Sequence, residues 1–146
     1  SILAEGMNHI NYQPLTITDY EECVELWKNS PGIALSSSDS LSAISQFLSR
    51  NPGLSFTARD GGKLVGAVLC GSDGRRGYLY HLAVAASHHH RGIGRELSTL
   101  SLNALKRMGI QKCHIFVVAD NLAGARFWQK TGWQKREDIF VMSRDL

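Results

Sequence analysis

The chain has 146 residues, of which 43% are hydrophobic and 20% are charged, and it carries a formal net charge of +3. A chain of this length is expected to form one domain, and its apolar fraction excludes a disordered or collagen-like protein. No run of about eighteen apolar residues is present, so we expect no membrane partner. The small positive charge does not require nucleic acid as a partner, and we expect none.

Three cysteines, Cys23, Cys70 and Cys113, form an odd set without a C-x-x-C pair. This pattern favours buried thiols in a reducing, cytoplasmic setting over a disulfide framework. Residues 1–7 lack a basic start followed by a long apolar run, so we expect no signal peptide. We assign them to a terminal segment whose native origin is open, and residues 8–146 to one domain.

Apolar spacing and turn residues predict a strand, two helices and a hairpin in the first half. Thr18 and Glu21 form a predicted capping box at the start of the first helix. Asn51-Pro52-Gly53 ends the second helix, and Asp60-Gly61-Gly62 predicts a hairpin turn. In chain order, the predicted elements are strand 10–15, helix 18–27, a helix carrying the apolar residues of 41–48, strand 54–59 and strand 63–70.

The second half alternates between strand and helix patterns. Gly109 ends the long central helix, because glycine is typical of the position after a helix C-terminus. The predicted order of elements, β-α-α-β-β-β-α-β-α-β, is that of a mixed α/β fold. The elements are strand 78–84, a basic segment 88–95, helix 97–108, strand 113–118, helix 122–130 and one or two strands within 133–142.

The basic segment between a strand and a helix carries the strongest functional signal. Gly92 and Gly94 allow the backbone to approach a ligand, and the free N–H groups of the first helical turn attract anions. Cationic or polar donors surround that turn, namely His89, His90, Arg91 and Arg95. The pattern predicts a site for phosphate or pyrophosphate. A turn without a ligand is the alternative explanation of this segment taken alone.

Two common phosphate loops are excluded by the residues that follow the glycines. A Walker loop needs Lys followed by Ser or Thr, where this chain has Arg95-Glu96. A dinucleotide fingerprint needs a third glycine, where this chain has Leu97. The histidines at 88–90 are adjacent and do not share a face of a strand or helix, so we expect no metal site.

The segment resembles the central motif of the GNAT superfamily of acetyl-CoA-dependent N-acetyltransferases, Gln/Arg-x-x-Gly-x-Gly/Ala. It reads His89-His90-Arg91-Gly92-Ile93-Gly94 in this chain. A second family motif is matched by Asn121-x-x-Gly124-Ala125-Arg126-Phe127-Trp128-x-x-x-Gly132-Trp133. The chain is also similar to small bacterial members of unassigned substrate. The two motifs stand at the family's spacing, and the resemblance in strand order covers nearly the whole chain.

The resemblance implies a single α/β domain with a mixed, mostly antiparallel, twisted sheet flanked by helices. The sheet is expected to splay between strands Tyr78–Val84 and Cys113–Val118. The implied activity moves an acetyl group from acetyl-CoA to a primary amine of a small molecule or protein, by direct transfer in a ternary complex. The residues implied to bind acetyl-CoA are Leu82, Ala83, Val84, His89, His90, Arg91, Gly92, Ile93, Gly94, Arg95, Asn121 and Trp128.

Two positions depart from the family pattern. His89 replaces the usual Gln or Arg, although its ring can still donate to a phosphate. Trp128 replaces a tyrosine that family members often use to protonate the departing thiolate, and an indole N–H is not an acid near neutral pH. A non-catalytic acyl-CoA-binding regulatory domain is therefore the alternative function.

The sequence offers two residues for the general base that removes the proton from the amine. Family members commonly have a Glu on the strand that corresponds to 78–84, where this chain has Tyr80 and His81. His81 has a suitable intrinsic basicity, and strand alternation predicts that Tyr80 points to the opposite face. The identity of the amine, the base and acid, and the oligomeric state, including a homodimer, stay open at this point.

Overall fold

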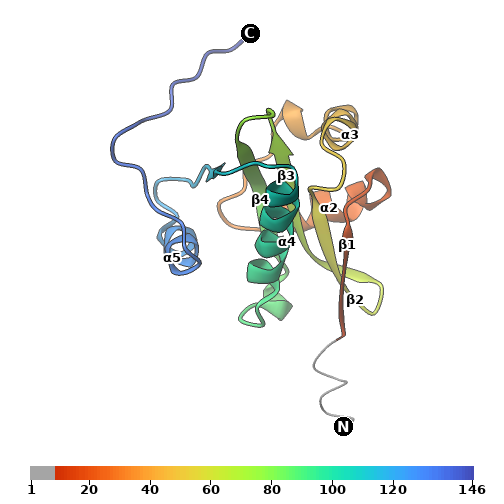
Figure 1. Cartoon of the computed structure of the whole chain (residues 1–146). Helices are drawn as coiled ribbons and strands as arrows, with labels where there is room; N and C mark the ends of the chain where they lie inside the picture. The colour runs from red at the N-terminus through yellow and green to blue at the C-terminus, as the bar shows by residue number, and fades with distance from the viewer. Residues whose placement is uncertain (1–8) are drawn as a thin grey trace. The chain divides into compact units, whose positions relative to one another are not determined.

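The computed structural model describes residues 9–146, so the predicted terminal segment 1–7 lies outside the described residues. Five strands form one sheet in the order β1-β2-β3-β4-β5 (Figure 1). The strands are β1 (Ile10–Pro14), β2 (Phe56–Asp60), β3 (Lys63–Ser72), β4 (Gly77–Val84) and β5 (Cys113–Ile115). The helices are α2 (Tyr20–Lys28), α3 (Leu41–Arg50), α4 (Ile93–Arg107) and α5 (Leu122–Lys130), with short 3-10 turns η1 (Ile17–Asp19), η2 (Ser37–Asp39) and η3 (Ala86–His88).

The contacts divide the chain into two compact units. The first ends at Phe116 and contains the whole sheet, and the second, Val117–Leu146, contains α5. Among residues 9–146, every helix is too short or too polar to cross a lipid bilayer.

The sheet is antiparallel except at one edge. Strands β1 to β4 pair antiparallel in chain order, whereas β4 and β5 run parallel. That parallel pairing covers three positions and ends at Leu79 opposite Ile115, while β4 continues to Val84. The sheet therefore opens along the last residues of β4, as predicted, although β5 is shorter than the expected strand 113–118.

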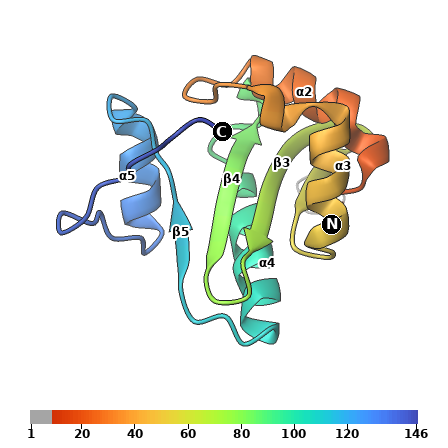
Figure 2. The same cartoon turned by 90° about the horizontal axis from the view of Figure 1, so that it is seen from above.

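Helices cover both faces of this sheet, with α4 on one face and α2 and α3 on the other (Figures 1 and 2). Two glycines of β3 show how closely the layers approach. A Cβ added at Gly66 would lie 2.9 Å from Leu97 of α4, and one added at Gly71 would lie 2.8 Å from Phe47 of α3. Neither position has room for a side chain, which explains the glycines.

The core on the α2/α3 side is built around the indole of Trp27. Trp27 and Cys23 of α2 are fully buried, and they cluster with Ile44 of α3 and with Leu69 of β3 and Ala83 of β4. Burying a side chain of this size stabilises the fold by roughly 2–3 kcal/mol. This apolar cluster supports the part of β4 where the sheet opens.

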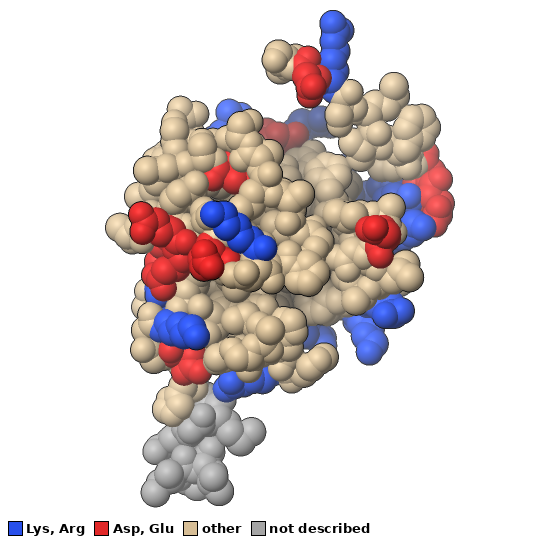
Figure 3. All heavy atoms as spheres, turned by 180° about the vertical axis from the view of Figure 1, so that it is seen from behind, with Lys and Arg blue, Asp and Glu red and all other residues tan. Residues whose placement is uncertain are grey.

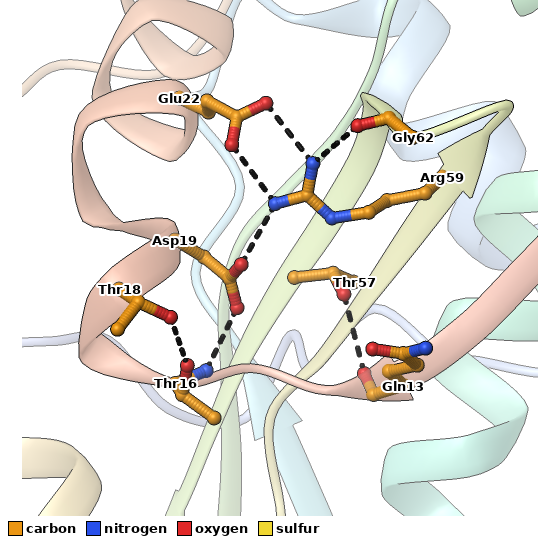
Figure 4. Close-up of polar contacts among 8 residues, drawn as sticks. All are labelled: Gln13, Thr16, Thr18, Asp19, Glu22, Thr57, Arg59 and Gly62. Atoms are coloured by element: carbon orange, nitrogen blue, oxygen red, sulfur yellow. Dashed lines mark hydrogen bonds and ion pairs between the residues drawn. The ribbon is translucent and has the colours of Figure 1, made fainter.

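The first helix begins later than the sequence pattern predicts, because a 3-10 turn precedes it. The Thr16 N–H donates to Asp19 Oδ2 at 2.9 Å, so the capping pair is Thr16 and Asp19 rather than Thr18 and Glu21. Asp19 also accepts a 2.7 Å bond from Arg59, which in turn binds Glu22 and the Gly62 carbonyl (Figure 4). The helix start is thus anchored to the β2–β3 hairpin.

The predicted strand within 133–142 is wrong. None of residues 131–146, all of which the structure describes, lies in a strand. The apolar residues that suggested it, Ile139 to Met142, are exposed. A strand forms only where a neighbouring strand accepts its backbone hydrogen bonds, and an alternating or apolar pattern does not supply that partner.

Candidate active site

A β-bulge interrupts β4 where the sheet begins to open. Ala83 pairs with Ala67 and Tyr80 pairs with Leu69, so His81 and Leu82 together face the single residue between those two on β3. His81 has a φ of 53°, in the left-handed region that side chains rarely adopt. Bulges are frequent beside active sites because they redirect side chains, so this distortion points to function.

His81 is held by residues from three other elements. Its Nε2 lies 2.7 Å from Asp39 Oδ1, and its backbone carbonyl accepts a 2.8 Å bond from Trp27 Nε1. The Trp27 and His81 rings lie 5.1 Å apart. Asp39, only 7% exposed, is itself fixed by the Ser36 N–H and by Tyr20, whose hydroxyl donates to its backbone carbonyl at 2.6 Å. The imidazole is therefore oriented on a buried carboxylate.

Asp39 was not singled out by the sequence. The sequence around it contains a capping pattern, Ser36-x-x-Asp39, which could have indicated a helical turn. The serine-rich composition of this stretch instead predicts a loop. The structure shows that this loop contains η2 and that Asp39 Oδ2 accepts the Ser36 N–H at 3.0 Å. The second oxygen of the same carboxylate is then free to bind His81. No local pattern reports that long-range contact.

Tyr80 lies on the same side of the sheet as His81, which corrects the expectation of opposite faces. Tyr80 packs against the same buried cluster that contains Trp27, because the bulge breaks the alternation between positions 80 and 81. Its ring lies 6.1 Å from Phe47, 6.4 Å from Tyr78 and 6.4 Å from Phe116. Burial raises the pKa of the Tyr80 phenol, so the hydroxyl keeps its proton.

A cavity of about 240 Å³ adjoins these rings within the first unit. Asn51 links the end of α3 to the β3–β4 turn across it, because its Oδ1 accepts the Ser72 N–H at 2.9 Å. The lining residues come from the end of α3, the β3–β4 turn and β4, namely Phe47, Arg50, Asn51, Gly71, Ser72, Asp73, Tyr78 and Tyr80. Sequence reasoning did not predict this cavity, whose walls are far apart along the chain.

The N-terminus of α4 has the geometry of an anion site. Gly92 adopts a φ of 80°, and no side chain caps the helix. The first intrahelical backbone bond is donated by Glu96 to the Gly92 carbonyl, so the N–H groups of residues 93–95 have no acceptor within the helix. Free N–H groups and the positive end of the helix dipole are features that suit a pyrophosphate.

The histidines before this helix are directed differently from one another. His89 Nε2 donates to the Val84 carbonyl at 2.8 Å, which ties the loop to the end of β4 and leaves Nδ1 for a ligand. His90 is exposed and has a φ of 63°. His88 instead binds Asp60 at 2.7 Å, and that bond lowers the pKa of the Asp60 carboxyl. Within the described part of the chain, no cluster of three metal-ligating residues forms.

The two remaining residues predicted to bind acetyl-CoA belong to the second unit. Asn121 caps α5, because its Oδ1 accepts the Gly124 N–H at 3.0 Å. Trp128 is buried, with T-shaped contacts to Phe127 and Trp133 at 5.0 and 5.2 Å between ring centroids. Both side chains therefore have structural roles inside their own unit.

Comparison with known proteins identifies the family of this site. The model of the acetyltransferase (GNAT) family matches residues 20–133, which include both motifs. The chain belongs to the GNAT acetyltransferase family. It is 27% identical over 128 residues to an acetyltransferase of Sodalis glossinidius, covering 88% of this chain and 89% of that protein. It is 29% identical over 99 residues to N-alpha-acetyltransferase 30 of Schizosaccharomyces pombe, covering 64% of this chain and 66% of that protein.

Solved structures share the fold. The PaiA N-acetyltransferase of Thermoplasma acidophilum, determined with coenzyme A, superposes with a TM-score of 0.76 at 22% identity and covers 86% of this chain and 89% of that chain. An aminoglycoside acetyltransferase from a soil metagenome, determined with sisomicin, superposes with a TM-score of 0.75 at 17% identity. The match covers 95% of this chain and 97% of that chain. This GNAT protein is therefore an acetyltransferase with acetyl-CoA as donor, and the non-catalytic alternative is not favoured.

Proposed function

We propose that this GNAT protein acetylates a primary amine by direct transfer in a ternary complex, with His81 as the proton acceptor. The observation that carries the proposal is the pair formed by His81 and the buried Asp39 carboxylate, 2.7 Å apart, at the bulge of β4. A carboxylate that binds one ring nitrogen fixes the orientation of the imidazole and directs its other nitrogen to a substrate. The raised pKa of Tyr80 favours His81 over Tyr80 for this role.

We further propose that the donor lies along the open end of β4 and the start of α4. Leu82, Ala83 and Val84 extend beyond the β5 pairing, and we propose that the pantetheine arm binds the backbone groups there that neither β3 nor His89 engages. The phosphate-binding residues are proposed to be His89, His90, Arg91, Gly92, Ile93, Gly94 and Arg95. For Asn121 and Trp128 of the second unit, a role in donor binding stays a proposal from the family motif. Bound there, acetyl-CoA supplies an activated thioester carbonyl.

The proposed reaction uses few protein groups. The neutral amine attacks the carbonyl carbon, a C–N bond forms and the C–S bond breaks. His81 takes a proton from the attacking nitrogen, with Asp39 keeping the ring in place. Starting from an ammonium ion, one proton leaves to solvent and one returns to the thiolate. Backbone N–H groups near Leu82 to Val84 are placed to stabilise the oxyanion.

We also propose the domain organisation, the partners and the cellular location of the protein. The family match spans both compact units, which supports one domain over 8–146. On the face drawn in Figure 3, Lys and Arg side chains are interspersed with Asp and Glu, which supports a function without nucleic acid. We place the protein in the cytoplasm because its three cysteines are free thiols. A homodimer is a further expectation from the family.

The test is a screen of primary amines with acetyl-CoA, followed by His81→Gln and Asp39→Asn on the best acceptor. We expect His81→Gln to lower kcat at least a hundredfold and to remove the fall of kcat/KM toward low pH. Asp39→Asn should lower kcat less, about tenfold, because the ring stays but loses its orienting charge. Coenzyme A binding, measured by calorimetry, should be unchanged in both. Full turnover by His81→Gln would refute the role of His81.

A further inference from the structure

The 240 Å³ cavity contains one cationic side chain without a partner. The Arg50 guanidinium forms no hydrogen bond or ion pair with any of residues 9–146. Arg59 of the same unit shows the contrast, since it binds two carboxylates and a carbonyl. An arginine with five free donors in a fixed fork is suited to a carboxylate. Arg50 is thus available to a ligand of the cavity.

The charge around the cavity favours an anionic group on the ligand. Asp73 is the acidic residue in its lining, and its Oδ1 already accepts the N–H groups of Arg75 and Arg76, both at 2.8 Å. This carboxylate fixes the β3–β4 turn. Arg75 and Arg76 belong to the same turn, so the lining and this turn together hold three arginines and one aspartate. A polycationic acceptor would need more acidic than basic side chains around the cavity.

The walls of the cavity are aromatic. Phe47 and Tyr80 meet edge to face at 6.1 Å, and Tyr78 stacks on Tyr80 at 6.4 Å with an angle of 18° between the rings. Such surfaces bury an aliphatic or aromatic body. The volume is below the roughly 300–1,000 Å³ of pockets for drug-sized ligands. The occupant is therefore a small molecule, or the end of a larger one.

The cavity adjoins the proposed reacting end of the site. Tyr80 lines the cavity, and it is also the first residue of β4 beyond the pairing with β5. His81 follows it directly. Arg50, in contrast, belongs to the last turn of α3, beside the β3–β4 turn (Figure 2). A molecule that spans the cavity lies between Tyr80, which precedes His81 in β4, and Arg50.

We propose that the acceptor is an amine that also carries a carboxylate, of the kind of an α-amino acid with an apolar or aromatic side chain. Its carboxylate pairs with Arg50, its body lies against Phe47, Tyr78 and Tyr80, and its amino group is directed toward His81. The proposal rests on the proposed amine acetylation, whose substrate class it names. The reaction is the one already written, with the amino nitrogen of the amino acid forming the C–N bond.

Two matched pairs of amines test the role of the carboxylate. L-Phenylalanine is compared with phenethylamine, and L-leucine with isoamylamine, by steady-state acetylation with acetyl-CoA. We expect the amino acid of each pair to have at least a tenfold higher kcat/KM. Arg50→Gln should remove this preference mainly by raising KM, with kcat within threefold, and Arg50→Lys should restore part of it. Arg107→Gln, which removes one exposed charge from the end of α4, is the control and should behave as the wild type.

A binding measurement without turnover separates this proposal from the proposed function. 3-Phenylpropanoate has the carboxylate and the ring but no amine, and calorimetry should detect its binding to the wild type and at least tenfold weaker binding to Arg50→Gln. If no amine is acetylated while this binding persists, the transfer proposal fails and the carboxylate site stands. If phenethylamine is acetylated as well as L-phenylalanine, or Arg50→Gln and Arg107→Gln behave alike, the carboxylate site is refuted.

Discussion

The Arg59 guanidinium makes the most bonds of the side chains drawn in Figure 4, and one substitution tests what they stabilise. It binds Asp19 at 2.7 Å and Glu22 at 2.9 and 3.0 Å, and is mostly shielded from solvent. We expect Arg59→Met to lower the free energy of unfolding by about 1–2 kcal/mol at pH 7, since a bidentate, partly buried pair exceeds the usual surface pair. Urea unfolding measures this loss, with Arg107→Met as the control.

The same bonds make the effect dependent on pH. The hydrogen bond from Arg59 lowers the pKa of Glu22 below its usual 4.5. The folded carboxylate therefore binds protons less readily than the unfolded one, and its contribution is present above about pH 4.5 and lost as the pH falls. The difference between wild type and Arg59→Met should accordingly be smaller at pH 3.5 than at pH 7. An equal or larger difference at pH 3.5 would contradict this assignment.

Trp128 tests whether the departing thiolate needs an acid from this position. The indole is buried against Phe127 and Trp133, and it cannot give up a proton near neutral pH. Trp128→Phe should keep kcat within threefold while lowering stability by about 1–2 kcal/mol through the smaller ring. Trp128→Tyr should raise kcat where thiolate departure limits the rate. A hundredfold loss of kcat in Trp128→Phe, at unchanged coenzyme A affinity, would show that the indole takes part in the chemistry.

At the residue scale, the sequence predicted His81 but not the group that holds it. Strand periodicity assigns side chains to alternating faces, and the bulge at His81 breaks that rule, so Tyr80 and His81 reach the same side. Asp39 and Arg50 are ordinary loop and helix-end residues by pattern. Their importance comes from contacts across many residues of chain, which local spacing does not encode.

At the element scale, the start of α4 carries the proposed donor site, and Gly94 tests it. Gly94 lies inside α4, so aspartate is compatible with its backbone and even favourable to the helix dipole. Its charge would nevertheless oppose a pyrophosphate held by the free N–H groups. We expect Gly94→Asp to weaken coenzyme A binding at least tenfold, about 1.4 kcal/mol, in calorimetry. The control is Thr99→Asp, on the exposed side of the same helix. Unchanged affinity in a folded Gly94→Asp protein would exclude the loop from the donor site.

Elements with a strong local pattern were predicted well, and those that depend on a partner were not. Helix α4 and the β2–β3 hairpin follow from apolar spacing and from turn glycines. The strand predicted at 113–118 is confirmed only over Cys113–Ile115. The strand predicted within 133–142 is absent from the described chain. Both errors concern strands next to the opening of the sheet or after it. There, pairing with a neighbour decides the outcome, and the apolar pattern alone does not.

At the scale of the whole molecule, two buried thiols and a partly buried one link stability to alkaline pH. Burial raises the pKa of Cys23 and Cys70 to about 12, and that of Cys113 to about 11, from the ordinary thiol pKa of 9.0. Above pH 9 the unfolded chain loses thiol protons that the folded chain retains. A folded pKa above the unfolded one gives stability that is present below pH 9 and lost as the pH rises.

The size of this loss is set by the number of thiols. The buried Cys23 and Cys70 should each lower the free energy of unfolding by about 1.4 kcal/mol between pH 8 and pH 10, or roughly 3 kcal/mol together, and the partly exposed Cys113 should contribute less. Urea unfolding across that interval measures the loss in the wild type and in the variant Cys23→Ala/Cys70→Ala/Cys113→Ala. The variant should be less stable at pH 8, because alanine leaves small cavities. Its free energy of unfolding should nevertheless change less between pH 8 and pH 10. Parallel curves for the two proteins would mean that other groups, and not these thiols, determine the response to alkali.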